Sequence, residues 1–382
     1  MKCKISDICS FRKDKINVSN LTLKTYISTE NMLPNKGGIT KATSLPTIDL
    51  IQAYKKGDVL VSNIRPYFKK IWLAKFDGGC SNDVLVFKAN EKTDNKFLYY
   101  VLADDAFFTY AMATSKGTKM PRGDKTSIMQ YEVPYYEVKT QKIIASILKS
   151  IDDKIELNNA INNNLEQQAQ ALYQKMFIEN ANPEWSEGTI SDLGIVVGGS
   201  TPSKAKPEYY TQHGIAWITP KDLSLNKSKF ITRGENDISE LGLRNSSATI
   251  MPKGTVLFSS RAPIGYIAIA AGDVTTNQGF KSIVPKSEIG TAFVYYFLKN
   301  ALPTIEGIAS GSTFKEISGN TMKSVPAFIP NNEALAKFNK FCVPIFEQQQ
   351  LLESQNQHLS KMRDTLLPKL MSGELDVSDI DL

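Results

Sequence analysis

Two stretches of the chain carry apolar positions at the spacing of a long helix. Between Lys142 and about Phe177 there is no Pro or Gly, and suitable positions recur at alternating gaps of three and four residues. The same alternation recurs from Ile345 to Leu370. The first seam consists of Leu148, Ile151, Ile155, Asn158, Asn162, Leu165, Ala169, Leu172 and Met176, and the second of Ile345, Gln349, Leu352, Asn356, Leu359, Arg363, Leu366 and Leu370. This heptad pattern predicts two coiled-coil helices.

Polar residues interrupt both seams, so either helix alone would be a poor coiled coil. Asn158 and Asn162 interrupt the first seam, and Gln349, Asn356 and Arg363 interrupt the second. We predict that the two helices pack antiparallel about a pseudo-twofold axis, with the buried polar groups fixing the register at a cost in stability. The alternative is two separate amphipathic helices, each lying on its own domain.

The rest of the chain has a mixed pattern. Short β-branched runs at 58–62, 83–87, 255–258 and 265–270 are separated by Gly, Pro, Asn and Asp, which predicts strands. A few helices intervene, most clearly at 97–110 and 292–300. We therefore predict an α+β protein in which two mixed α/β domains are separated by two long antiparallel coiled-coil helices. The predicted segments are residues 1–141, 142–180, 181–332, and 333–382, the last including an acidic C-terminal tail.

The two mixed segments look like copies of one unit. KGDVLVSNIRP at 56–66 matches KGTVLFSSRAP at 253–263, and further matches follow in the same order. These pair Ser81–Asp83 with Thr276–Gln278, 97–100 with 293–296, 115–118 with 310–313, and 133–134 with 325–326. Conserved order with small drifts in spacing indicates a duplicated unit with loop insertions.

Composition narrows the class of protein. The chain of 382 residues has a net charge of +6, which favours an anionic partner. Its four cysteines form no C-x-x-C pair and its two histidines lie far apart in sequence, so a zinc cluster is not expected. No signal peptide or apolar run of roughly 18 residues is visible, and the unpaired cysteines favour the cytoplasm.

Two pairs of polar turns offer contacts for DNA bases. Arg261, after Ser259 and Ser260, and Arg65 in the first copy suit guanine, whereas Ser suits either bases or phosphates. The alternative is that each Arg pairs with a carboxylate inside its own domain. Asn277 and Gln278, with Asn82 in the first copy, suit adenine. Asn277 equally fits a turn-forming role.

Two loops offer contacts for phosphates. GGSTPSK at 198–204 lacks the ending of a nucleotide-binding loop, but its polar and basic residues fit a phosphate backbone. Lys116, Lys119 and Arg122 form a denser basic loop, for which a simply solvated surface is the alternative. We find no metal-ligand cluster, nucleophile elbow, Walker motif or amino-methyltransferase tetrapeptide.

As a set, these motifs resemble the specificity subunit of type I restriction-modification systems. The resemblance covers almost the whole chain, and its strongest carriers lie at 198–224, 254–285 and 366–377. Segments 30–39, 62–74 and 115–125 resemble another variant of the family's recognition domains. The resemblance implies that each mixed domain is a target recognition domain for one half of a split, asymmetric DNA site. It also implies that the two helices set the gap between the half-sites. About 30 helical residues rise roughly 45 Å, and one turn of B-DNA is roughly 34–36 Å long. A helical spacer of this order would place the two domains about one turn of DNA apart.

The resemblance also implies the partners. Two methyltransferase subunits would dock on this chain and methylate adenine N6 with S-adenosylmethionine, and two restriction/translocase subunits would add cleavage driven by ATP and Mg. This chain would bind no cofactor and would not be an enzyme. Its candidate DNA-binding residues are Arg65, Asn82, Lys116, Lys119, Arg122, Ser200, Thr201, Lys204, Lys221, Ser259, Ser260, Arg261, Asn277 and Gln278.

Two other functions remain open from sequence. One is a tandem binding or scaffold module outside a methylation system, and the other is a free-standing enzyme, which the missing motifs disfavour. The copies differ where contacts are expected, since Thr-Asn-Gln-Gly at 276–279 becomes Ser-Asn-Asp-Val at 81–84. Such a difference fits an asymmetric target, because two identical domains would recognise a palindrome.

Overall fold

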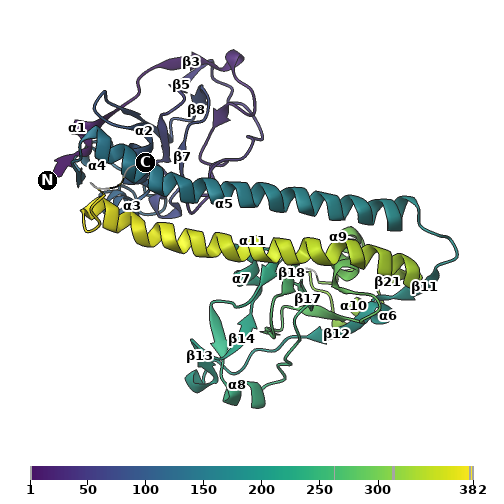
Figure 1. Ribbon diagram of the computed structural model, residues 1–382. Coiled ribbons are helices and arrows are strands. Elements are labelled where there is room, and N and C mark those ends of the chain that lie inside the picture. Colours follow the sequence, from purple (N-terminus) through teal and green to yellow (C-terminus); the bar gives the residue numbers. More distant parts are fainter. Residues whose placement is uncertain (1, 262, 312–314, 378–379, 381–382) are drawn as a thin grey trace. The chain divides into compact units, whose positions relative to one another are not determined.

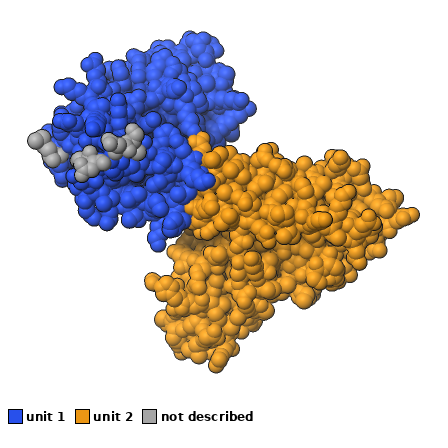
Figure 2. All heavy atoms as spheres, viewed as in Figure 1, with its two compact units in different colours: residues 1–155, 358–382 blue, residues 156–357 orange. Residues whose placement is uncertain are grey.

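The computed structural model describes residues 2–261, 263–311, 315–377 and 380. The chain forms two compact units, one made of residues 1–155 with 358–382 and the other of residues 156–357 (Figure 2). Each unit contains one mixed domain and a part of both long helices. The predicted matches at Ala262, Ser312 and Thr313 lie outside the described residues, as do positions 378, 379, 381 and 382 of the C-terminal tail. The predicted boundaries between the four segments stay predictions.

Two long helices occupy the predicted stretches (Figure 1). Helix α5 spans Val138–Tyr173 and continues as a wider helical turn, η3 (Gln174–Glu179), whereas α11 spans Asn332–Ser372. Every position of the two predicted seams is buried or half-buried. The heptad pattern therefore identified the packed face of both helices correctly.

The helices pack against each other within each unit, as predicted. In the second unit, the buried Asn158 donates from Nδ2 to Asn356 Oδ1 at 2.9 Å, and Gln349 Nε2 donates to the carbonyl of Asn162 at 3.2 Å. In the first unit, Arg363 Nη1 bonds Asp152 Oδ1 at 2.9 Å. Residue numbers rise along one helix as they fall along the other, so the pair is antiparallel. Two separate amphipathic helices are thereby excluded.

The first unit is built on two small sheets. Its larger apolar core lies under a sheet of order β2-β9-β6-β7 and the helices beside it. The strands are β2 (Cys9–Phe11), β9 (Val84–Ala89), β6 (Val59–Ser62) and β7 (Ile71–Leu73), and the second sheet holds β3 (Lys15–Asn17), β5 (Leu50–Tyr54), β8 (Gly78–Cys80) and β4 (Tyr26–Ile27). The remaining elements are β1 (Lys2–Lys4) paired with β10 (Glu132–Pro134), α1 (Ile5–Ile8), η1 (Val18–Asn20), η2 (Pro66–Phe68), α2 (Asn95–Ala103), α3 (Asp105–Ala113) and α4 (Lys125–Ile128).

The second unit repeats this plan. Its larger sheet has the order β12-β20-β17-β18-β15, whose first four strands correspond one by one to those of the first unit. The strands are β12 (Gly194–Gly198), β20 (Lys281–Pro285), β17 (Val256–Ser260), β18 (Ile264–Ala270) and β15 (Phe230–Ile231), and the second sheet holds β13 (Tyr210–Thr211), β16 (Asn236–Ile238), β14 (Ile215–Ile218) and β19 (Thr275–Thr276). The remaining elements are β11 (Ser186–Thr189) paired with β21 (Pro326–Ile329), α6 (Ile190–Leu193), η4 (Pro207–Tyr209), α7 (Pro220–Leu225), α8 (Glu240–Arg244), α9 (Thr291–Gly307) and α10 (Gly319–Lys323).

Backbone hydrogen bonds correct two of the predicted residue pairings between the copies. Asn63 N donates to Asp83 O, as Ser260 N donates to Gly279 O, so Arg261 corresponds to Ile64, as the match of 56–66 with 253–263 predicts. Ser81 N donates to Ile27 O as Asn277 N does to Ile218 O, which makes Gln278 the counterpart of Asn82. The predicted pairing of Asn82 with Asn277 was therefore wrong by one residue. The pairing of Ser115 with Ser310 was wrong in the same way, because Lys116 exchanges backbone bonds with Arg122 as Ser310 does with Glu316.

Candidate DNA-binding surfaces

In the second unit, three loops meet at the end of the larger sheet and gather several candidate residues. Ser200 N donates to Thr276 O at 2.8 Å, and the hydroxyl of Thr201 bonds the side chain of Gln278. Gly199 lies so close to the Asn277 carbonyl that a Cβ there would be 1.9 Å from its oxygen. This contact requires glycine and fixes the loop that carries Ser200 and Thr201 against the loop that carries Gln278.

Charged side chains lie beside these loops. Arg261 Nη1 lies 3.4 Å from Glu316 Oε2, and both side chains are partly exposed. Lys281 Nζ bonds the Gln278 carbonyl at 3.4 Å, and burial lowers the pKa of Lys281, with Arg261 acting in the same direction. For Arg261, the alternative of a pairing inside its own domain is therefore confirmed. Its partial exposure leaves the guanidinium within reach of a ligand.

The other candidate residues of this unit differ in their burial and in their hydrogen-bond partners. Ser259 is buried, and its hydroxyl donates to Pro263 O and accepts from Tyr266 N, so it holds the turn after β17. Asn277 Oδ1 accepts from Gly279 N at 2.9 Å, which gives it the turn-forming role. Ser260 is fully buried. Lys204 is exposed in its loop, whereas Lys221 on α7 forms an exposed ion pair with Glu235 at 2.5 Å.

In the first unit, candidate residues also converge at the end of the corresponding sheet. Arg65 N donates to Pro121 O at 2.8 Å, which ties the turn after β6 to the basic loop 116–122. Arg122 Nη2 lies 3.2 Å from Asp83 Oδ1, next to the exposed Asn82. Within the part of the chain that the structure describes, Arg65 forms no ion pair, and its Nε is buried without a hydrogen-bond partner.

The basic loop itself is fixed at one end. Lys116 Nζ bonds Asp124 Oδ2 at 2.6 Å, and this bond, with those from Ser127, lowers the pKa of Asp124 to about 2. Lys119 is exposed at the tip of the loop. Arg65, Asn82, Lys116, Lys119 and Arg122 thus lie on one connected surface, as do Thr201, Gln278 and Arg261 on the second unit.

The two surfaces carry different charges on equivalent backbone hydrogen bonds. We call this shared set of backbone bonds at the end of each larger sheet the frame. Arg122 occupies the place that Glu316 has in the second unit, since Arg122 bridges Ile64 as Glu316 bridges Arg261, and each also exchanges backbone bonds with a preceding residue, Lys116 or Ser310. The cation of the second unit, Arg261, occurs where the first unit has Ile64. The frames therefore present unlike sets of donors and acceptors to a ligand.

Each mixed domain is fastened to the long helices by a tyrosine and an acidic residue. Tyr100 OH donates to Asp152 at 2.7 Å in the first unit, and Tyr296 OH donates to Glu166 at 2.9 Å in the second. Burial opposes the charge of Glu166, but Lys229 and Lys299 outweigh it and lower its pKa to about 2. Sequence analysis missed this anchor, although the repeated Tyr-Tyr pair at 99–100 and 295–296 is visible in the sequence.

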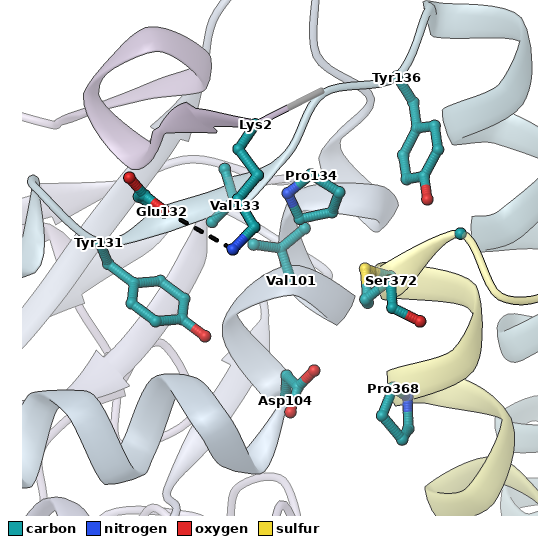
Figure 3. A pocket seen from close by; sticks show the side chains of 12 residues that line it. Lys2, Val101, Asp104, Tyr131, Glu132, Val133, Pro134, Tyr136, Pro368 and Ser372 are labelled. Atoms are coloured by element: carbon teal, nitrogen blue, oxygen red, sulfur yellow. Dashed lines mark ion pairs between the residues drawn. The ribbon is translucent and has the colours of Figure 1, made fainter.

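A cavity of about 330 Å³ in the first unit is lined by Ser81 and Asp83, beside the candidate Asn82, whereas two further cavities lie away from the candidate surfaces. A cavity of about 470 Å³ in the first unit is lined by β1, α2, β10 and the end of α11, where Lys2 faces Glu132 (Figure 3). A cavity of about 540 Å³ lies at the corresponding place in the second unit, among Tyr173, Phe297 and Phe328. Neither contains a candidate residue. Among the described residues there is no group of three or more potential metal ligands, and no helix suited to span a membrane.

The chain matches the family model described as type I restriction modification DNA specificity domain, at residues 1–167 and 182–361. The two matched segments cover most of the chain, one in each copy of the repeat. The chain therefore belongs to this family of type I specificity subunits.

Individual relatives agree with this assignment. The chain is 26% identical to the type I restriction enzyme HindI specificity subunit of Haemophilus influenzae, over 92% of this chain and 94% of that protein. It is 44% identical to the MjaIX specificity subunit of Methanocaldococcus jannaschii, over 40% of this chain and 36% of that protein. The fold matches the crystal structure of a type I S subunit from M. genitalium with a TM-score of 0.65 at 16% identity, over 99% of this chain and 96% of that one.

Proposed function

We propose that this chain recognises a split, asymmetric DNA site and positions the other subunits of a type I restriction-modification complex on it. The proposal rests on one observation: both units have the same frame of backbone bonds, but the side chains at equivalent positions differ. Each frame gathers cationic and amide groups at the end of one sheet, and such groups suit base edges and phosphates. Because Arg122 and Glu316 occupy the same place, the two domains would select different half-sites.

The chemistry of the complex would belong to the partners. Two methyltransferase subunits would use S-adenosylmethionine to methylate adenine N6 in each half-site, with the target base flipped into the methyltransferase. Two restriction/translocase subunits would use ATP and Mg. This chain would contribute DNA recognition and spacing without catalysis, in the cytoplasm. Family membership does not favour the alternative of a binding module outside a methylation system.

Methylation mapping with domain-specific variants tests the proposal. The chain is expressed with its modification subunit in a host free of adenine methylation, and the DNA is sequenced for N6-methyladenine. We expect a split motif with one methylated adenine on each strand. Arg122→Ala should relax only one half of this motif, and Gln278→Ala only the other, because each side chain lies on one frame.

Matched controls exist at the opposite ends of the same strands. Lys92 follows the far end of β9, and Lys286 follows the far end of β20, and both are exposed. Lys92→Ala and Lys286→Ala should leave the motif unchanged. A palindromic motif without a gap, or relaxation of both halves by a single-domain variant, would contradict the proposal.

A further inference from the structure

One loop of the first unit has no equivalent in the second. Between β6 and β7 the chain passes through residues 63–70, whereas residues 261–263 alone connect the corresponding strands β17 and β18. The additional residues carry the sequence Tyr67-Phe68-Lys69-Lys70. We call residues 65–70 the aromatic loop. Since the flanking strands correspond, this loop is an insertion into the shared frame at its candidate DNA-binding end.

The aromatic loop has a fixed and unusual backbone. Arg65 and Lys69 both have a φ of 50°, a left-handed conformation that residues other than glycine rarely adopt. Neighbouring segments hold it in place, because Asn35 N donates to Phe68 O at 2.8 Å and Lys36 N donates to Lys69 O at 2.9 Å. Such conformations persist where the surroundings impose them, and they cluster at functional sites.

Within this backbone, two aromatic rings face solvent. Tyr67 is 50% exposed and Phe68 is 37% exposed, and their ring centroids lie 4.7 Å apart. Met120, which is also exposed, precedes the proline that bonds Arg65. Lys70 Nζ lies 5.7 Å from the centre of the Phe68 ring. The result is an apolar tip bordered by cations.

We propose that Tyr67 and Phe68 stack on DNA bases when the first domain binds its half-site, either on an exposed base or between two unstacked base pairs. The inference rests on the proposed function and adds a recognition element to it. Aromatic side chains beside cations are the usual means of contacting base faces, since the cations neutralise phosphates while the rings stack. Arg65, at the start of the loop and without an ion pair among the described residues, supplies such a cation.

Two observations favour DNA over a protein subunit as the ligand of this loop. The loop is continuous with the surface of Arg65 and Arg122. It also occurs in one unit only, whereas a subunit that binds twice to a duplicated chain would contact features present in both copies. A second copy of the same partner would find no aromatic loop on the second unit.

The test uses the complex of this chain with its modification subunit and a duplex that contains the mapped site. Binding is measured by fluorescence anisotropy, and 2-aminopurine replaces bases one at a time at positions that are not methylated. Tyr67→Ala with Phe68→Ala should weaken binding roughly 5- to 150-fold, the range for loss of one stacked base. The salt dependence should stay unchanged, because no charge is removed.

The controls are matched in chemistry and exposure. Tyr135 is 50% exposed in the same unit but lies beyond β10, so Tyr135→Ala should bind as the unchanged complex does. Tyr67→Phe keeps the ring and should retain affinity, which separates stacking from a hydroxyl contact. In the unchanged complex, 2-aminopurine emission should rise at one step of the half-site bound by the first domain, and the double variant should lose this rise.

The outcomes separate the two proposals. If the double variant binds DNA as tightly as Tyr135→Ala, the loop does not stack on bases. If it instead loses the modification subunit during purification, the loop is a protein interface and the inference is overturned. If the unchanged complex binds no DNA in a salt-dependent way, the proposed function itself fails, and the role of the loop fails with it.

Discussion

Replacement of Lys229 tests how the second domain is fastened to the helices. Lys229 is buried, and its Nζ bonds Glu166 Oε2 at 2.6 Å and Gln349 Oε1 at 2.9 Å. It also lies 3.7 Å from the centre of the Phe346 ring. One side chain on a loop thus contacts both α5 and α11. Burial lowers the pKa of Lys229 to about 8, although Glu166 opposes the shift.

The expected loss of unfolding free energy depends on the partners that Glu166 keeps after Lys229 is replaced. Removing one partner of a buried ion pair costs about 3–5 kcal/mol of unfolding free energy, because the other charge stays buried. In Lys229→Met, Glu166 keeps Lys299 at 2.8 Å and Tyr296 at 2.9 Å, and its side chain is 22% exposed. We therefore expect the lower end of the range, about 3 kcal/mol.

Urea unfolding of the chain, followed by tryptophan fluorescence and circular dichroism, measures this loss. Lys221→Met is the matched control, because it breaks the exposed pair with Glu235 in the same unit and should have no measurable effect. Adding Glu166→Gln to Lys229→Met should cost less than the two single changes together, because no buried charge is left without its partner. A loss for Lys229→Met no larger than that of the control would refute the reasoning.

Three further predictions concern the same unit and the helix pair. The pKa of Glu166 is lowered to about 2 from 4.5, so its stabilising effect should be present above pH 4.5 and disappear between pH 4.5 and 2, and acid titration of unfolding should be flatter there for Glu166→Gln. Asn158→Leu combined with Asn356→Leu should leave the thermal midpoint unchanged or raise it, since replacing both partners of a buried hydrogen bond by apolar groups of similar shape is nearly neutral or stabilising. A clear fall in the midpoint would contradict this. Gly199→Ala should destabilise by about 1–3 kcal/mol through overpacking against Asn277, whereas Gly198→Ala, with nothing within 4 Å of its Cβ, should not; equal midpoints would contradict the close contact.

The helix pair was predictable from sequence because heptad spacing is a local property. The polar seam positions also carried information, since Asn158 and Asn356 bond each other across the pair. The repeat was visible for the same reason, in contiguous matching runs. One further match, Ile5-Ser-Asp-Ile8 with Ile190-Ser-Asp-Leu193, was missed, and it corresponds to α1 and α6.

The candidate sites were less predictable because they depend on long-range contacts. Nothing near Lys229 in sequence indicates that it meets Glu166 and Gln349, and nothing near Arg261 indicates Glu316. The two arginines were given the same role, although the match of 56–66 with 253–263 and the backbone bonds to Asp83 and Gly279 both place Arg65 one residue after the counterpart of Arg261. Arg261 therefore lies at the backbone bridge with Glu316, whereas Arg65 lies in the aromatic loop.

The contrast between frame and side chains explains how one duplicated fold can bind two different half-sites. Equivalent backbone bonds, such as those of Asn63 with Asp83 and Ser260 with Gly279, hold the ends of both sheets in the same geometry. These bonds involve only main-chain atoms, so they do not restrict the side chains at positions 64, 122, 261 and 316. Changes there alter which groups face a ligand without a cost to the sheet. An insertion such as the aromatic loop can extend the frame for the same reason, since it begins and ends within bonded backbone.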